Sequence, residues 1–369
     1  MPTGTIGQPS TTISCFPKKK WKTILAGGDP HQKASTYFIS RLIHKAARFI
    51  AQKTKHYNYI LDFAAARSSY FLMREAKKHK ADLYIAHNLG ALAAAAKAAK
   101  YYKKPCGFDA EDFHRQEVSD DENSYNFKIA KLLEDKYLPG LSYLSASSPL
   151  TAAKYESLYK RPVTCILNVF PKTSGISVIN NQDMPLKLFW FSQTIGPNRG
   201  LETIIEAMVL SEKTVELHLL GQPADGYRQH LLQLARNKGI NDNRIFFYEP
   251  VNGDLIFKMA AQFDVGLASE TNVCLNRNLS LTNKIFTYIQ SGLAVAASNT
   301  LAQGEFMQQY PQIGKTYGSA GELASVLTEY DKDRDLLFQA KRESFKIGQD
   351  QLNWEIESQK FLTVIKNYT

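Results

Sequence analysis

Cysteine is scarce in this chain and shows no paired spacing. Cys15, Cys106, Cys165 and Cys274 lie far apart, whereas zinc sites and disulfide-rich domains use closely spaced sets. Long apolar runs are missing too, since no stretch approaches the roughly 18 consecutive apolar residues of a membrane-spanning helix. The first residues are polar and lack the apolar segment of a signal peptide. We therefore expect reduced thiols, no metal site and a cytoplasmic protein.

Acidic residues are few in the first half of the chain. Residues 1–170 hold 26 Lys and Arg against 14 Asp and Glu, whereas the remainder holds 19 against 21. The basic clusters are Lys18-Lys19-Lys20, Lys77-Lys78-His79-Lys80 and Lys100 with Lys103-Lys104. They indicate either solvated helix ends and loops, or attraction to anionic lipid headgroups at the inner face of a membrane or to a phosphorylated acceptor. Nucleic acid is not an expected partner, because no helix-turn-helix or RNA-binding signature accompanies the basic residues.

The chain of 369 residues is too long for one ordinary domain, and expected strands alternate with expected helices. In the second half the strands fall at residues 186–192, 215–221, 244–248, 265–269 and 294–298, and the alternation is shorter over 81–170. Such alternation implies parallel sheets covered on both faces. We predict an α/β protein of two Rossmann-like domains in tandem, residues 1–170 and 186–369, with a ligand-binding cleft beyond the carboxyl ends of the strands.

The start of the first domain is open to two interpretations. Residues 22–28 could form a first strand that ends in the pair Gly27-Gly28. Alternatively, the first strand–helix unit could be absent, so that the N-terminal domain is truncated. Apolar residues then recur at helical spacing over residues 35–53 and over much of 57–78.

A loop after the first strand of the second domain has side chains suited to a phosphate group. Within residues 192–200, Gly196 allows a tight turn, and Arg199 lies just before an expected helix. A helix N-terminus has free N–H groups and a partial positive charge, so an arginine beside it makes a strong anion site. The alternative is an ordinary turn between a strand and a helix.

A second loop, residues 278–284, has the same character. Ser280, Thr282 and Asn283 are helix-capping types, and Lys284 lies in the first turn of the expected helix. A lysine there opposes the helix dipole, and a bound diphosphate would compensate for that. The alternative is a tolerated surface lysine.

Together these segments resemble the family 4 glycosyltransferases of the GT-B fold. The similarity is carried by Ser192 with Arg199-Gly200-Leu201-Glu202, by residues 246–251 and 255–266, and by the continuous stretch 283–298. The resemblance implies that Arg199 and Lys284 hold the diphosphate of a nucleoside-diphosphate sugar. It implies a sugar transferase that retains anomeric configuration, needs neither metal nor cofactor, and acts on a glycan or lipid-linked acceptor. It also implies that the last helix packs back on the first domain.

The chain departs from this family at two positions. A glutamate that binds the donor ribose is replaced by Thr287, and a second, upstream glutamate is replaced by Leu279, while Glu270 is out of register. A sugar-nucleotide-binding protein with little or no transferase activity is therefore the alternative. A dinucleotide-dependent oxidoreductase is disfavoured, because no GxGxxG follows an expected strand with an acidic residue about 20 positions later.

Three polar residues follow strands of the first domain. His87 ends the strand over residues 81–87, and Glu111 and Asp112 follow the strand over 106–110. Several carboxylates at a strand end are costly unless they are solvated, paired or used. Many members of the family carry Asp-Ala-His-Glu here, so the resemblance implies catalytic positions that contact the acceptor or the donor sugar. The alternatives are helix caps, salt bridges and a structural histidine.

Overall fold

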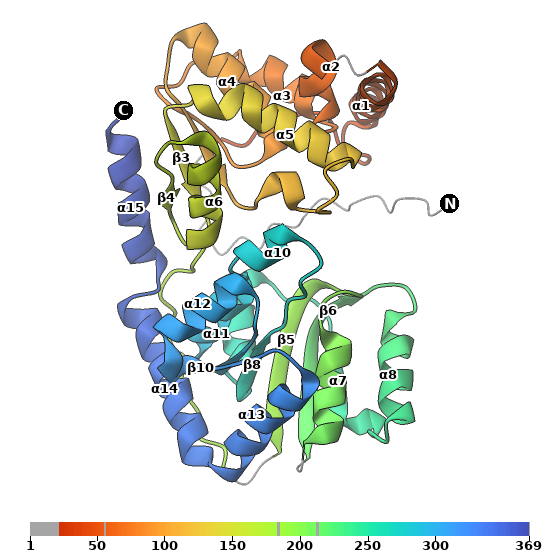
Figure 1. The fold of residues 1–369 in the computed structure, drawn as a ribbon, viewed down its shortest axis with the longest axis vertical. Coiled ribbons are helices and arrows are strands. Elements are labelled where there is room, and N and C mark those ends of the chain that lie inside the picture. Colours follow the sequence, from red (N-terminus) through yellow and green to blue (C-terminus); the bar gives the residue numbers. More distant parts are fainter. Residues whose placement is uncertain (1–21, 55–56, 183–184, 212–213, 369) are drawn as a thin grey trace.

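Two parallel sheets, each with its own helices, organise the chain (Figure 1). A computed structural model describes residues 22–54, 57–182, 185–211 and 214–368. The first sheet has four strands in the order β1-β2-β3-β4, and the second has six in the order β10-β9-β8-β5-β6-β7. The predicted α/β class with two Rossmann-like domains is confirmed.

The first domain is mainly helical before its sheet begins. Its helices are α1 (Ala34–Thr54), α2 (Tyr57–Ala64), α3 (Ser69–Ala76), α4 (Leu89–Tyr102), α5 (Tyr125–Tyr137) and α6 (Pro149–Tyr159). Its strands are β1 (Tyr84–Ala86), β2 (Cys106–Ala110), β3 (Tyr143–Ala146) and β4 (Thr164–Cys165). Asn88 and Ser148 begin α4 and α6 because each side chain accepts a backbone N–H of the first turn.

Residues 22–28 form no strand, so the possible first strand is wrong. Gly27 and Gly28 have φ of 85° and 71°, a left-handed conformation that does not continue a strand. Their carbonyl oxygens accept hydrogen bonds from the Arg67 guanidinium at 2.5 and 3.2 Å, where a strand would accept them from a neighbouring strand. Within the described residues, the first sheet therefore starts at β1.

The second domain alternates strands and helices to the end of the chain. Its strands are β5 (Leu186–Ile195), β6 (Val215–Pro223), β7 (Ile245–Tyr248), β8 (Val265–Ala268), β9 (Ala294–Ser298) and β10 (Gly314–Tyr317). Its helices are α7 (Leu201–Leu210), α8 (Tyr227–Asn237), α9 (Gly253–Ala260), α10 (Leu275–Leu279), α11 (Asn283–Ser291), α12 (Leu301–Gln309), α13 (Ala320–Lys332), α14 (Arg334–Asp350) and α15 (Trp354–Lys366). Leu188, Phe189 and Trp190 of β5 are all fully buried, so helices cover both faces of this sheet.

The strand order reverses between β5 and β8. The chain runs outward from β5 to β6 and β7, and then returns to build β8, β9 and β10 on the other side. Loops that leave the two strands at such a reversal diverge, and ligands of open α/β sheets bind there. The loops after β5 and β8 are hydrogen-bonded to each other, because Ser269 Oγ donates to the Arg199 carbonyl at 2.7 Å and Thr271 Oγ1 to the Asn198 carbonyl at 3.0 Å.

Several boundaries differ from the sequence-based expectation. Strand β5 continues to Ile195 because it keeps pairing with β6 beyond a bulge between Phe191 and Thr194. Helix α10, helix α12 and strand β10 were not expected. Residues 278 and 279, taken as part of a loop, belong to α10. A five-residue helix is too short to be stable by itself, so its contacts with the first domain account for α10.

Helix α10 bridges the two domains (Figure 1). Leu275 and Leu279 lie one turn apart and pack with the apolar core of the first domain. The Leu279 carbonyl accepts hydrogen bonds from the hydroxyls of Ser148 and Thr151. A leucine at position 279 therefore serves the contact between domains.

Helix α15 forms a second bridge and runs beside the first domain in Figure 1. The Glu357 carboxylate accepts the Leu167 N–H at 2.9 Å, and the Tyr368 hydroxyl donates to the Ser142 carbonyl at 2.8 Å. These contacts join the end of the chain to the first domain, just after β4 and just before β3.

Candidate functional site

Arg199 lies in the loop between β5 and α7, at the reversal of strand order. Two residues of this loop have left-handed backbone, Asn198 with φ of 59° and Gly200 with φ of 74°. A Cβ atom at position 200 would lie 3.1 Å from Ser269 Cβ, so glycine is needed there for the close approach of the two loops. Gly196, which was expected to allow a tight turn, has no left-handed φ, and a Cβ there would meet only ordinary contacts, the nearest at 3.7 Å.

Lys284 lies in the first turn of α11, and its ammonium group is buried. Its Nζ forms an ion pair of 2.7 Å with Glu270 Oε1, and the two side chains are only 8% and 6% exposed. Thr282 caps α11 by accepting the Lys284 N–H, and the same hydroxyl lies 3.4 Å from Nζ. Glu270 supplies a negative charge that offsets the unfavourable position of this lysine near a helix N-terminus.

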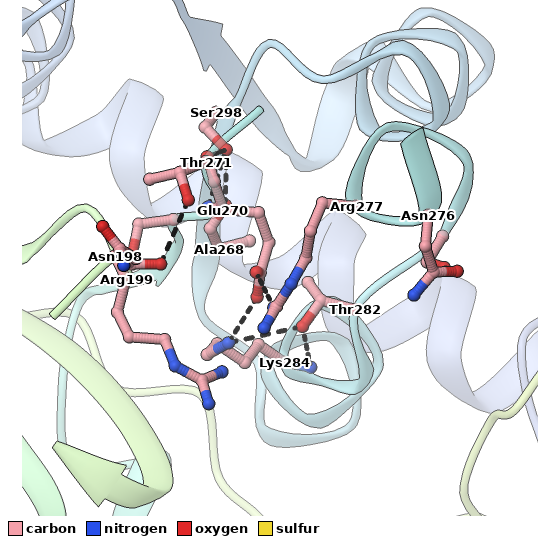
Figure 2. A network of polar contacts seen from close by, with 12 residues as sticks. Asn198, Arg199, Ala268, Glu270, Thr271, Asn276, Arg277, Thr282, Lys284 and Ser298 are labelled. Carbon is pink, nitrogen blue, oxygen red and sulfur yellow. Dashed lines mark hydrogen bonds and ion pairs between the residues drawn. The ribbon is translucent and has the colours of Figure 1, made fainter. Parts of the chain in front are cut away.

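Glu270 is surrounded by three cationic side chains. Arg277 Nη1 lies 2.5 Å from Glu270 Oε2, and Figure 2 shows the Arg199 guanidinium beside the Lys284 ammonium group, without a direct contact to Glu270. Burial by itself would raise the pKa of Glu270, but the three cations together hold it below its ordinary value. Burial, together with the charge of Arg277, lowers the pKa of Arg199. Three cations against one carboxylate leave an excess of positive charge that can bind an anion such as a diphosphate.

Other predicted donor-site residues are less directly involved. Ser280 Oγ donates to Asn276 Oδ1 at 3.0 Å and so supports α10. The Asn283 side chain is exposed, and its carbonyl accepts from Thr287 Oγ1 at 3.1 Å. Thr287 is 1% exposed, so its hydroxyl is enclosed by its own helix.

A second polar cluster lies at the carboxyl edge of the first sheet. His87 Nδ1 is 3.2 Å from Asp109 Oδ2, and the Ser145 hydroxyl donates to the other oxygen of Asp109. Burial raises the pKa of Asp109, against the effects of Ser145 and His87. Loss of hydration likewise raises the pKa of the nearby Glu111, and its two aspartate neighbours raise it further. These carboxyls therefore keep a proton to a higher pH than exposed carboxyls do, and they can bind hydroxyl groups.

Asp112 connects this cluster to α10. Its Oδ1 accepts from Asn276 Nδ2 at 2.8 Å, and Asn276 Oδ1 in turn accepts the Phe113 N–H at 2.7 Å. Asn276 is 4% exposed. The next residue, Arg277, also pairs with Glu270, so adjacent positions of one short helix contact the two polar clusters.

Sequence reasoning missed Glu270, Arg277, Asn276 and Asp109 as site residues. Glu270 follows the end of β8, where the strand order reverses, and this position was the available signal. Asn276 and Arg277 gave no such signal, because their helix was not recognised. Among the described residues, no group of three or more His, Cys, Asp or Glu side chains is placed to hold a metal ion.

In the described part of the chain, every helix is too short or too polar to cross a bilayer. Two Rossmann-like domains whose strand ends meet in this way define the GT-B fold, and this chain has that fold. No model of a known protein family matches the chain, and no curated protein matches it in sequence.

Solved structures match the chain in fold. HepE from Anabaena, solved with UDP-glucose, has a TM-score of 0.64 at 20% identity over 80% of this chain and 81% of its own. Sucrose-phosphate synthase from Thermosynechococcus elongatus has a TM-score of 0.64 at 14% identity over 85% and 79%. A glycosyltransferase from Rickettsia africae has a TM-score of 0.61 at 14% identity over 84% and 82%. Each match covers at least 80% of this chain, so it includes parts of both of its domains.

Proposed function

We propose that the protein transfers a sugar from a nucleoside-diphosphate sugar to an acceptor hydroxyl. The observation that carries this proposal is the convergence of Arg199, Lys284 and Arg277 at the reversal of strand order in the second sheet (Figure 2). Open α/β sheets bind ligands at that point, and the negative charge of a diphosphate would pair with these cationic side chains. UDP-sugars are the first donors to test, because HepE was solved with UDP-glucose.

In this proposal the cations act on the leaving group. When the bond between sugar and diphosphate breaks, negative charge grows on the diphosphate oxygens, and positioned cations stabilise that charge. They would supply the charge that a metal ion supplies in other transferases, so we expect turnover in the presence of EDTA. Because Lys284 is paired with Glu270 in the free protein, donor binding must share or replace this ion pair.

The first domain would provide the acceptor side. We assign His87 and Glu111 to contacts with sugar or acceptor hydroxyls, with the acceptor on a glycan or a lipid. Asp112 is assigned a positioning role, because Asn276 already occupies one of its carboxylate oxygens. Transfer with retention would require attack from the side of the leaving group, and the anomeric configuration of the product, read by NMR, tests this.

Binding of UDP to charge-removing variants tests the donor site. Arg199→Ala and Lys284→Ala should each weaken binding by roughly 1.5 to 3 kcal/mol, the scale of a charge-assisted hydrogen bond, as measured by calorimetry. Arg236→Ala, which removes an arginine paired with Asp242 on the surface of α8, should leave affinity unchanged.

A double variant separates a loss of UDP binding from a loss of stability, because it leaves neither charge of the buried ion pair without its partner. Lys284→Ala leaves Glu270 with one buried ion pair fewer, whereas Glu270→Gln with Lys284→Gln removes both charges of that pair. If this double variant and Arg199→Ala bind UDP as the parent does, the site assignment is wrong.

A sugar-nucleotide-binding protein without transferase activity is the second candidate. It is favoured by Thr287 and Leu279, which stand where related enzymes have glutamates and which are both buried. The two candidates differ in turnover: release of UDP from a UDP-sugar, even by slow hydrolysis, supports the transferase, and tight binding with no release supports the alternative.

A further inference from the structure

Helix α1 presents an apolar stripe to solvent. Phe38, Leu42 and Phe49 are 63%, 69% and 61% exposed, and their spacing of four and seven residues places them on one side of the helix. Ile39, at 52%, borders the stripe. Single exposed apolar residues are ordinary on protein surfaces, whereas a contiguous group marks an interaction site.

The opposite side of α1 is already packed, so the helix cannot turn its stripe inward. Ser40, Ala47 and Ala51 are buried, and the two alanines belong to an apolar cluster with residues of α2 and α5. The Ser40 hydroxyl donates to the Gly27 carbonyl at 3.0 Å, and His44 Nε2 lies 3.2 Å from the Ala64 carbonyl oxygen. Contacts along the whole helix therefore hold its orientation.

The charge of α1 indicates which kind of surface would bind the stripe. The helix contains Arg41, Lys45, Arg48 and Lys53 and has neither aspartate nor glutamate. Lys45 falls between Leu42 and Phe49 on the exposed side. A second copy of this surface would bring like charges together, which opposes self-association. An apolar stripe flanked by cations fits the boundary of a bilayer with anionic headgroups.

We propose that α1 is a membrane-docking helix that lies in the plane of an anionic lipid surface. Phe38, Leu42 and Phe49 enter the acyl boundary, and the basic side chains contact lipid phosphates. Figure 1 places α1 at the outer edge of the first domain, far from α15. Docking through α1 brings the first domain to the lipid surface, where a lipid-linked acceptor would be found. The docking itself does not depend on sugar transfer, and it is tested without a nucleotide.

Vesicle flotation of the full chain tests this surface. We expect binding to vesicles of phosphatidylcholine mixed with phosphatidylglycerol and much weaker binding to phosphatidylcholine alone. Leu42→Ser with Phe49→Ser should reduce binding at least about tenfold, since each side chain buries apolar area in the bilayer. Lys45→Glu should reduce it about fivefold or more, the scale of one basic residue near an anionic surface.

Controls make the outcome decisive. Leu210→Ser changes another exposed leucine, 59% exposed on α7 of the other domain, and should bind as the parent does. Thermal unfolding should be unchanged in all these variants, because the replaced side chains face solvent. The proposal is overturned if the parent chain does not float with anionic vesicles, or if the double variant floats as well as Leu210→Ser. It is overturned as well if the parent is a dimer in solution and the double variant is a monomer that still floats. In that case the stripe would join two copies of the chain and would not bind lipid.

Discussion

At the scale of single residues, the site depends on a carboxylate shared by cations. Glu270 and Lys284 are both nearly buried, and two charges taken out of water are costly unless they compensate each other. Arg277 adds a second ion pair to the same carboxylate. Glu270 thus stabilises a set of cations that would repel one another, and it holds them where the proposed donor diphosphate would bind.

Replacing Glu270 tests this role. Glu270→Gln should lower the free energy of unfolding by about 3 kcal/mol, because it leaves buried cations uncompensated. Saturating UDP should restore part of the loss by supplying a new anion, so the increase in Tm with UDP should be larger than in the parent. Glu329→Gln, which breaks a surface pair with Lys315, is the control. An equal or smaller UDP-induced increase in Glu270→Gln would contradict the shared use of these cations.

His218 provides a prediction about pH. Burial lowers the pKa of this histidine from 6.5 to about 4, against the opposing effect of Glu216. The unfolded chain therefore binds a proton between pH 6.5 and 4 that the folded chain does not, and stability falls as the pH falls through this window. We expect the histidine to account for a loss of about 2 kcal/mol between pH 7 and pH 5.

A ring without a titrating group separates this effect from packing. His218→Phe keeps a ring where the histidine stacks on Phe246 with 4.6 Å between centroids. Denaturant unfolding at the two pH values should show a smaller loss of stability in this variant than in the parent. Equal losses in both proteins would exclude His218 as the source of the pH dependence.

At the scale of elements, the short helix α10 contacts both domains. Its apolar residues pack in the first domain, Asn276 binds the loop after β2, and Arg277 binds Glu270 in the second domain. One rigid turn therefore connects the proposed donor site to the proposed acceptor side. A change in the donor site that moves Arg277 would be transmitted to the domain contact.

The Asn276 contact allows a test that distinguishes binding from turnover. Asn276→Ala leaves the Phe113 N–H and the Asp112 carboxylate without this partner, which costs about 1 to 3 kcal/mol at a buried contact. We expect kcat with a UDP-sugar to fall about tenfold or more, while the Kd for UDP changes less than threefold, because Asn276 faces the first domain. Asn278→Ala on the same helix is the matched control. An equal loss in kcat and in UDP affinity would show that Asn276 belongs to the donor site itself.

At the scale of the whole molecule, the proposed function follows from where the strands end. The reversal between β5 and β8 brings the loops of residues 196–200 and 269–282 together, and α10 places the second loop against the first domain. Helix α1 lies at the outer edge of that domain (Figure 1), and its apolar stripe is exposed. The proposed donor site, the proposed acceptor side and the proposed membrane surface therefore occupy separate parts of one chain.

Much of this arrangement was predictable from the sequence. Strand and helix alternation identified the parallel sheets, and the polar loops after strands contained Arg199 and Lys284. Glu270 was not predicted, because its partners are 7 and 14 residues away in the chain and meet only through the turn of α10 and the start of α11. Leu279 also had no recognisable role, because the core that it enters belongs to the other domain.

The sequence by itself determined most of the local structure: where the longer strands and helices lie, and which charged side chains follow strand ends. These features depend on periodicity, capping and turn chemistry between near neighbours in the chain. Only the tertiary structure decided which charges are paired, which domain α10 joins, and that the apolar stripe of α1 remains outside. Those outcomes depend on contacts between residues distant in sequence, and neither spacing nor composition specifies such contacts.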